Sequence, residues 1–162
     1  MLVFLFLALF ARAQAAPLPI DAIRLFLGPM PDSNSEPFAL PKAFKASYAD
    51  LRRVHGKLTK LYRGTRSAPP LAFVDDAADA DLVLTVTHRG PLDDSRHDAG
   101  GTPTLIARLT VRRAGDNLEL VGITPGRKGH VSWTEQAERI YKQTVTFADA
   151  SHAGLIRLRA VR

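Results

Sequence analysis

Residues 81–87 have the sequence DLVLTVT, and this stretch decides the fold. From Leu82 onward every residue is apolar or β-branched, which is typical of a strand buried on both faces. Aspartates and alanines at 75–81 predict a turn or a single helical turn before the stretch, and a polar segment containing Gly and Pro follows it at 88–103. We therefore expect a central strand between a short turn and a long connection.

Four further segments predict the strands that accompany this one. Each is a short run rich in apolar and β-branched residues and bounded by turn formers. The last two are separated by Ala114-Gly115-Asp116-Asn117, a sequence typical of a hairpin turn. The four segments are IDAIRLFL (20–27), LAFV (71–74), TLIARLTVRR (104–113) and LELVGI (118–123).

Two segments predict amphipathic helices. Between Lys42 and Tyr62 the apolar residues recur every three or four positions, so they share one arc of a helix, and basic residues share the opposite arc. The second helix begins at Ser132-Trp133-Thr134-Glu135, a capping box in which the serine and glutamate side chains satisfy backbone N–H groups at the helix start. We expect this helix to end near Phe147 or Ala150.

The order of these segments is strand, helix, strand, strand, strand, strand, helix. The first strand–helix–strand unit predicts a parallel crossover, and the later hairpin predicts an antiparallel pair. We therefore predict an α/β (α+β) fold, in which two main helices pack on a mixed sheet of about five strands. The sequence shows no internal repeat and no interdomain linker, so residues 16–162 are expected to form a single globular domain with a basic C-terminal tail at 152–162.

The first fifteen residues predict a secretory signal peptide. Leu2 to Ala11 are almost all apolar, in a run too short to span a bilayer, and Ala13-Gln14-Ala15 supplies the small residues of a cleavage site. No Lys or Arg precedes the apolar run, and the alternative is a buried N-terminal strand or helix. Cleavage after Ala15 predicts a periplasmic or secreted protein with no transmembrane segment in its mature form.

The chain of 162 residues carries a formal net charge of +6 and contains no cysteine. The absence of cysteine excludes a disulfide scaffold, a cysteine nucleophile and a metal site with thiolate ligands. Removal of residues 1–15 takes away one basic residue, Arg12, and no acidic residue, which leaves a net charge of +5. Aromatic residues make up only 7% of the chain, which is little for stacking on bases, and we expect no nucleic-acid partner.

Four segments resemble parts of a group of exported bacterial α/β domains, namely IRLFLGPM (23–30), AADADLVLTVT (77–87), RLTVRRAGDNLELVG (108–122) and WTEQAERIYKQTV (133–145). The group includes the N-terminal domain of the TolB translocation protein and the periplasmic domains of curli-secretion lipoproteins. The chain departs from these proteins in having no lipoprotein cysteine and a long connection at 88–103. The resemblance implies an exported domain that contacts other envelope proteins rather than performing catalysis.

A cluster of histidines and aspartates after the central strand is a candidate metal site. Imidazole nitrogen and carboxylate oxygen are ligands for Zn²⁺ and Mn²⁺, and side chains four residues apart meet on a helix. The neighbouring Gly and Pro residues favour an irregular, solvated loop instead. The candidate metal ligands are His88, Asp94, His97 and Asp98, and we otherwise expect no cofactor.

Basic residues in two places are candidates for anion binding. One group lies on the polar arc of the first helix, and the other precedes the second helix, where backbone N–H groups favour anions. No GxxxxGK[ST] phosphate-binding sequence is present, and a basic helix face is often only solvated. The candidate residues are Lys45, Arg52, Arg53, Lys57, Arg127 and Lys128.

Three functions remain open on these grounds. The first, which we expect, is an exported envelope protein without enzymatic activity, whose domain binds envelope proteins or packs in an assembly. The second is a domain that binds an anionic surface, such as phospholipid headgroups or lipopolysaccharide. The third is a metal-dependent hydrolase that uses the cluster between His88 and Asp98. The sequence contains no GxSxG nucleophile motif that would favour an enzyme of the serine-hydrolase class.

Overall fold

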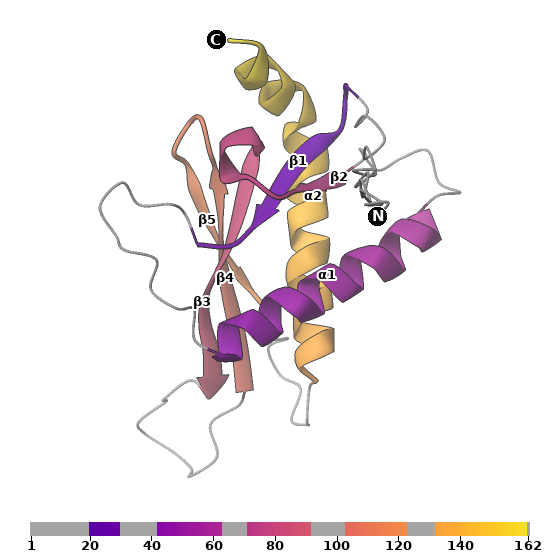
Figure 1. Cartoon of the computed structure of the whole chain (residues 1–162), viewed down its shortest axis with the longest axis vertical. Coiled ribbons are helices and arrows are strands. Elements are labelled where there is room, and N and C mark those ends of the chain that lie inside the picture. The colour runs from indigo at the N-terminus through magenta and orange to yellow at the C-terminus, as the bar shows by residue number, and fades with distance from the viewer. Residues whose placement is uncertain (1–19, 30–41, 63–70, 92–102, 123–131, 162) are drawn as a thin grey trace, which may run out of the picture.

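The structure, a computed structural model of the whole chain, describes residues 20–29, 42–62, 71–91, 103–122 and 132–161. In these ranges five strands form one mixed sheet in the order β2-β1-β3-β4-β5, with two long helices beside it (Figure 1). This arrangement confirms the predicted α+β fold and the predicted order of its elements. The elements are β1 (Ile23–Leu27), α1 (Lys42–Tyr62), β2 (Leu71–Val74), the 3-10 turn η1 (Ala77–Asp79), β3 (Leu82–Pro91), β4 (Pro103–Val111), β5 (Asn117–Val121) and α2 (Trp133–Ala160).

The sheet contains both parallel and antiparallel pairs of strands. β1 pairs in parallel with β2, which it reaches through the crossover containing α1, and in parallel with β3. β3, β4 and β5 are antiparallel neighbours. The tight turn between β4 and β5 places Gly115 at φ 78°, in the left-handed region that glycine adopts without a Cβ clash.

The first residues of the central strand β3 are buried on both faces, as predicted, whereas Thr87 further along the strand is exposed. Leu82, Val83 and Leu84 are fully buried, and Val86 is only 2% exposed. Because side chains alternate across a strand, Leu82, Leu84 and Val86 point into the core beneath the helices, whereas Val83 points to the other face of the sheet. Burial on both faces explains the apolar run at 82–84, whereas Thr85 and Thr87, on the face opposite the helices, are half-buried and exposed.

Both helices cover the same face of the sheet, since they contact each other as well as the strands. Their apolar arcs supply much of the core, and the capping box of Ser132 and Glu135 begins α2 as predicted. Among the described residues, neither helix contains a stretch that is both long enough and apolar enough to cross a membrane. The buried core residues of the helices are Tyr48, Leu51, Val54 and Leu58 of α1 and Ala137, Ile140, Tyr141, Ala148 and Leu155 of α2.

Tyr48 of α1 also forms a hydrogen bond to the backbone of β3 beside a β-bulge. The register between β3 and β4 shifts between Val86 and His88, which marks a β-bulge. The hydroxyl of Tyr48 accepts a hydrogen bond of 3.0 Å from the N–H of Val86 at this point. Burial raises the pKa of Tyr48, so its hydroxyl stays protonated at neutral pH.

Two elements are longer than the sequence predicted. β3 continues through His88 to Pro91, because β4 pairs with it as far as Pro91 and Pro103, so His88 lies in a strand and not in the expected loop. α2 continues to Ala160 instead of ending near Phe147 or Ala150. Residues 152–160, which we expected to begin a basic tail, therefore belong to this helix.

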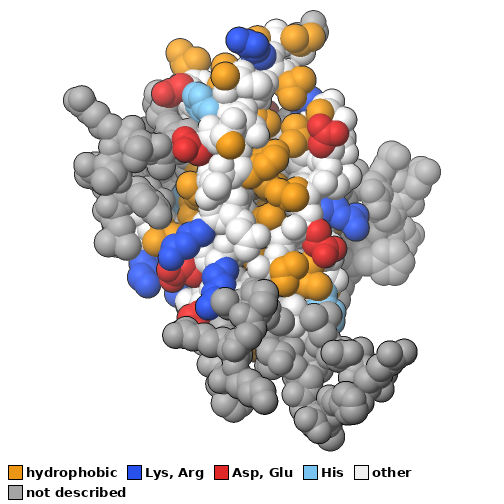
Figure 2. Space-filling model, turned by 180° about the vertical axis from the view of Figure 1, so that it is seen from behind, with side chains coloured by type: hydrophobic (Ala, Val, Ile, Leu, Met, Phe, Trp, Pro, Cys, Tyr) orange, Lys and Arg blue, Asp and Glu red, His pale blue; other side chains and the backbone are white. Residues whose placement is uncertain are grey.

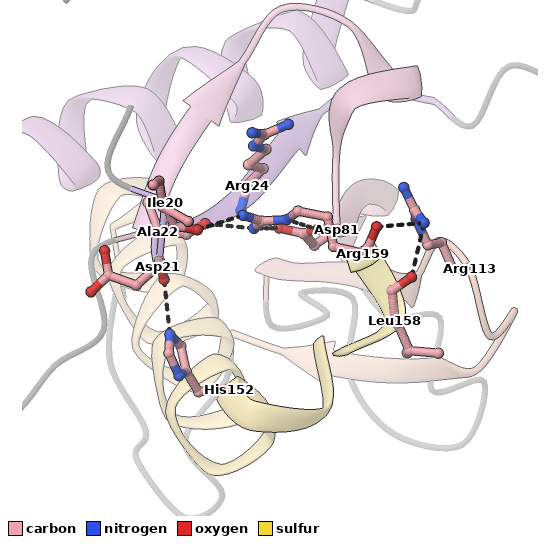
Figure 3. Close-up of polar contacts among 9 residues, drawn as sticks. All are labelled: Ile20, Asp21, Ala22, Arg24, Asp81, Arg113, His152, Leu158 and Arg159. Carbon is pink, nitrogen blue, oxygen red and sulfur yellow. Dashed lines mark hydrogen bonds and ion pairs between the residues drawn. The ribbon is translucent and has the colours of Figure 1, made fainter. Parts of the chain in front are cut away.

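Polar contacts hold the last turns of α2 against the sheet (Figure 3). The guanidinium of Arg159 pairs with Asp81, and it also donates to the carbonyl oxygens of Ile20 at 2.9 Å and Ala22 at 2.6 Å. Such contacts give the end of the helix a fixed position that its sequence alone does not predict. From the β4–β5 turn, Arg113 Nη1 donates to the last carbonyl groups of the helix region, those of Leu158, Arg159 and Val161.

Candidate functional site

α1 carries a strongly basic, exposed face. The helix contains six Lys or Arg residues but only one acidic residue, Asp50, and its first turn has no acidic residue. Its apolar arc is buried in the core, so the basic arc faces solvent. The structure therefore exposes together the four anion-binding candidates predicted for this helix, and we name them the basic face: Lys45, Arg52, Arg53 and Lys57.

Two residues of the basic face form exposed ion pairs. Arg53 Nη1 lies 3.4 Å from Asp50 Oδ1, and Lys57 Nζ lies 3.7 Å from Glu138 Oε2 on α2. The side chains of Arg53 and Lys57 nevertheless remain 70% and 66% exposed. Exposed pairs of this kind contribute only about 0–1 kcal/mol. The two cations are therefore open to a further anionic partner.

Glu138 lies between two lysines at the boundary of α1 and α2. Its Oε1 atom is 2.8 Å from Lys142 Nζ, and its Oε2 atom faces Lys57. The hydrogen bond from Lys142 is the main cause that lowers the pKa of Glu138, and the charge of Lys57 adds to it. Because one carboxylate lies between two ammonium groups, the sum of these three charges is positive at this end of the basic face.

His55 packs behind the basic face, between the two helices. Its Nδ1 atom lies 2.6 Å from the hydroxyl oxygen of Tyr141, and its ring centroid lies 4.0 Å from that of Phe73. Burial lowers the pKa of His55, so the imidazole is neutral at pH 7 and adds no charge to the basic face. The sequence analysis did not single it out, although its helical spacing from Leu51 and Leu58 places it on the apolar arc.

Arg89 joins the end of β3 to both helices. Its guanidinium carbon lies 4.4 Å from the ring centroid of Trp133, a cation–π contact with the first turn of α2. On α1, Arg89 Nη1 donates to Ser47 Oγ at 2.9 Å and lies 3.6 Å from Asp50 Oδ2. No local pattern predicted this contact, because Arg89 and Ser47 are 42 positions apart.

The other predicted site residues are largely outside the described part of the chain. His88 is described, and one of its ring nitrogens, Nε2, lies 3.2 Å from the carbonyl oxygen of Gly90. Within the described ranges, no group of three or more His, Asp or Glu side chains could hold a metal ion. The candidates that lie outside the described residues are Asp94, His97 and Asp98 for a metal, and Arg127 and Lys128 for an anion.

Comparison with known proteins identifies no family for this chain. No protein-family model matches the sequence, and no curated protein matches it. Among solved structures, a dodecamer of a PelC variant from Paraburkholderia phytofirmans is similar at 12% identity and a TM-score of 0.36, over 79% of this chain and 90% of that chain. A likeness of this size supports no argument about function. The resemblance to TolB-type and curli-secretion domains stays a prediction.

Proposed function

We propose that the chain is an exported, non-enzymatic interaction domain of the bacterial envelope that binds an acidic protein through the basic face of α1. The main support is the concentration of positive charge on one exposed helix, which has six basic residues and one acidic residue. Complementary charges across an interface speed association and select partners. The expected partner is therefore an envelope protein with a surface cluster of Asp and Glu side chains.

The packing of α1 supports this role, because it holds the basic face in one orientation. Leu51 and Val54 on the opposite arc are buried in the core, and Arg89 binds the first half of the helix from beneath. A preorganised surface loses less conformational freedom on binding than a flexible one. The partner therefore binds basic side chains on a helix whose backbone is already fixed by the fold.

An anionic lipid surface is the alternative ligand, since phospholipid headgroups and lipopolysaccharide carry the same charge. Helices that lie in a membrane interface bury an apolar face in the lipid. The apolar arc of α1 is already buried against the sheet and α2. The large apolar side chains that the described residues expose lie on other segments, namely Ile20, Leu118, Val121, Leu158 and Val161. These observations favour a protein partner.

A charge-reversal experiment tests the proposal. The variant Arg52→Glu/Arg53→Glu removes positive charge from the basic face, and Arg112→Glu/Arg157→Glu changes the net charge equally at basic residues outside α1. Partners are captured from envelope extracts, identified by mass spectrometry, purified and titrated against each variant at two salt concentrations. We expect an acidic partner whose binding weakens with salt, is lost with the first variant and is retained by the second.

Vesicles of phosphatidylglycerol provide the second arm of the experiment. If the chain sediments with these vesicles through the basic face and captures no acidic protein, the lipid alternative replaces the proposal. A captured partner that binds the Arg52→Glu/Arg53→Glu variant as tightly as the unmodified chain also overturns it. The circular dichroism spectrum of each variant confirms that the fold is intact.

A further inference from the structure

Within the described ranges, β5 is an edge strand of the sheet, and one side of its backbone pairs with no other strand. It is the last strand of the sheet and pairs only with β4 among the described strands. The hydrogen bonds Val111 N–H to Asp116 O at 2.8 Å and Gly122 N–H to Leu105 O at 2.9 Å define which residues of the strand face β4. In an antiparallel ladder every second residue directs its N–H and C=O to the partner strand. The groups that point away from β4 are therefore those of Asn117, Glu119 and Val121.

One end of this open edge is already occupied. The side-chain amide of Gln143 on α2 donates a hydrogen bond of 2.9 Å to the carbonyl oxygen of Val121. For the outward backbone groups of Asn117 and Glu119, no hydrogen bond is found within the part of the chain that the structure describes. As far as the described segments show, the part of the edge without a hydrogen-bond partner is thus centred on Leu118.

The side chains along β5 are unusually apolar for an exposed edge. Leu118 is 42% exposed and Val121 is 37% exposed. Figure 2 shows hydrophobic side chains gathered along the middle of the back of the molecule, with charged side chains toward its margins. Exposed edges are commonly protected by charge, proline or bulges, because they can otherwise pair with another chain. On β5 only Glu119 supplies a charge.

We propose that β5 pairs antiparallel with β5 of a second copy of this chain, about a two-fold axis at Leu118, so that the two sheets become one. Asn117 of each copy then lies opposite Glu119 of the other, and the outward N–H groups of both residues donate to the other strand's carbonyl groups. The two Leu118 side chains meet at the axis. This pairing uses the edge of the sheet and not the basic face, so it goes beyond the proposed function.

Charge and hydrogen bonding favour this register over the two registers whose axis is shifted toward Val121. An axis at Glu119 would place two carboxylates directly opposite each other, and like charges in that position are unfavourable. An axis at Leu120 would need the carbonyl of Val121, which already accepts the hydrogen bond from Gln143. With the axis at Leu118, the neutral carboxamide of Asn117 faces Glu119, and neither conflict arises.

Cysteine crosslinking tests this register directly, because the chain has no cysteine of its own. At the axis, the two Leu118 residues form a non-hydrogen-bonded pair, whose Cα separation of about 4.5 Å permits a disulfide. We expect Leu118→Cys to form a covalent dimer at least about tenfold faster than Glu119→Cys, whose copies would be too far apart. A mixture of Asn117→Cys and Glu119→Cys should crosslink between the two variants and not within either.

Sedimentation velocity on the unmodified chain accompanies the crosslinking, and Leu118→Lys serves as the interface variant. We expect a concentration-dependent dimer for the unmodified chain and a folded monomer for Leu118→Lys. Crosslinking of Glu119→Cys at the rate of Leu118→Cys overturns the proposed register. A monomer at all concentrations, with no Leu118→Cys dimer, overturns the pairing itself. The Arg52→Glu/Arg53→Glu variant should dimerise normally, so failure of the proposed function would be seen separately.

Discussion

The carboxylate of Asp81 and the guanidinium of Arg159 form an ion pair although 78 positions separate them in the sequence. Asp81 immediately precedes β3, and Arg159 lies in the last turn of α2. Their side chains are only 4% and 16% exposed. Asp81 Oδ2 also accepts a hydrogen bond of 2.8 Å from the N–H of Arg24. The pair thus connects β1, β3 and the end of α2 at one point.

Replacement of Asp81 by Asn should destabilise the protein strongly. The change leaves the guanidinium of Arg159 with no compensating charge, and breaking a buried ion pair from one side costs about 3–5 kcal/mol. Urea unfolding followed by circular dichroism measures the free energy of unfolding. The control is Asp79→Asn, an exposed residue for which we expect a change of at most about 0.5 kcal/mol. Equal stability of the two variants would contradict a structural role for the pair.

Truncation of Leu84 in the central strand should also be costly. Leu84 is fully buried in the core, and Leu→Ala changes at such positions lower the free energy of unfolding by about 2–5 kcal/mol, because a cavity remains. The matched control is Ile20→Ala, since Ile20 is 90% exposed. Urea denaturation of both variants gives the comparison. If Leu84→Ala were as stable as Ile20→Ala, the position of β3 at the centre of the core would be wrong.

The stability of the protein should fall as the solution is acidified below about pH 6.5, in part through His55. Burial lowers the pKa of His55 from 6.5, so the unfolded chain binds a proton in a pH range where the folded chain does not. The free energy of unfolding therefore decreases as the pH falls from the unfolded pKa toward the lower folded pKa. Urea unfolding at several pH values between about 5 and 8 measures this slope.

The control for this prediction is His55→Gln, which keeps a polar group near the hydroxyl of Tyr141 but does not titrate. We expect the slope to be shallower in the variant. Glu138 acts in a separate range, because its lowered pKa gives stability that is lost only as the pH falls below its ordinary value of 4.5. The same slope between about pH 5 and 7 in both proteins would show that His55 titrates normally in the folded state.

The predicted signal peptide should be removed when the chain is produced with its own N-terminus. We expect the mature protein to begin at Ala16, and its intact mass and N-terminal sequence in the periplasmic fraction or the medium are the measurements. Ala15→Tyr places a large residue at the cleavage position and should leave the precursor uncut. Recovery of an uncleaved chain from the cytoplasm would contradict the prediction of a signal peptide.

Local periodicity predicted the bounds of some elements closely. α1 begins at Lys42 and ends at Tyr62, as its apolar spacing indicated, and β2 spans the predicted LAFV segment. The bounds were wrong where a distant partner decides them. β3 extends to Pro91 because β4 supplies a ladder for its backbone, and α2 extends to Ala160 beyond the predicted end.

The same distinction between local patterns and distant contacts applies to the candidate site. The exposure of Arg52 and Arg53 could be predicted, because helical periodicity separates them from the apolar arc. The contacts of Glu138 and Arg89 with α1 could not, since each comes from a segment whose distance in space from the helix has no local signature. The basic face was therefore visible in the sequence, whereas the groups that support it and partly neutralise it were not.

The sequence by itself determined the kind and order of the elements, the caps and turns that bound several of them, and the arc on which each helix is apolar. These features depend on residues within a few positions of one another, through backbone preferences and the periodicities of helix and strand. Only the tertiary structure decided that Asp81 meets Arg159, that His55 meets Tyr141, and that β5 lies at an edge of the sheet. Such features depend on which distant segments pack together, and side-chain packing throughout the core determines this.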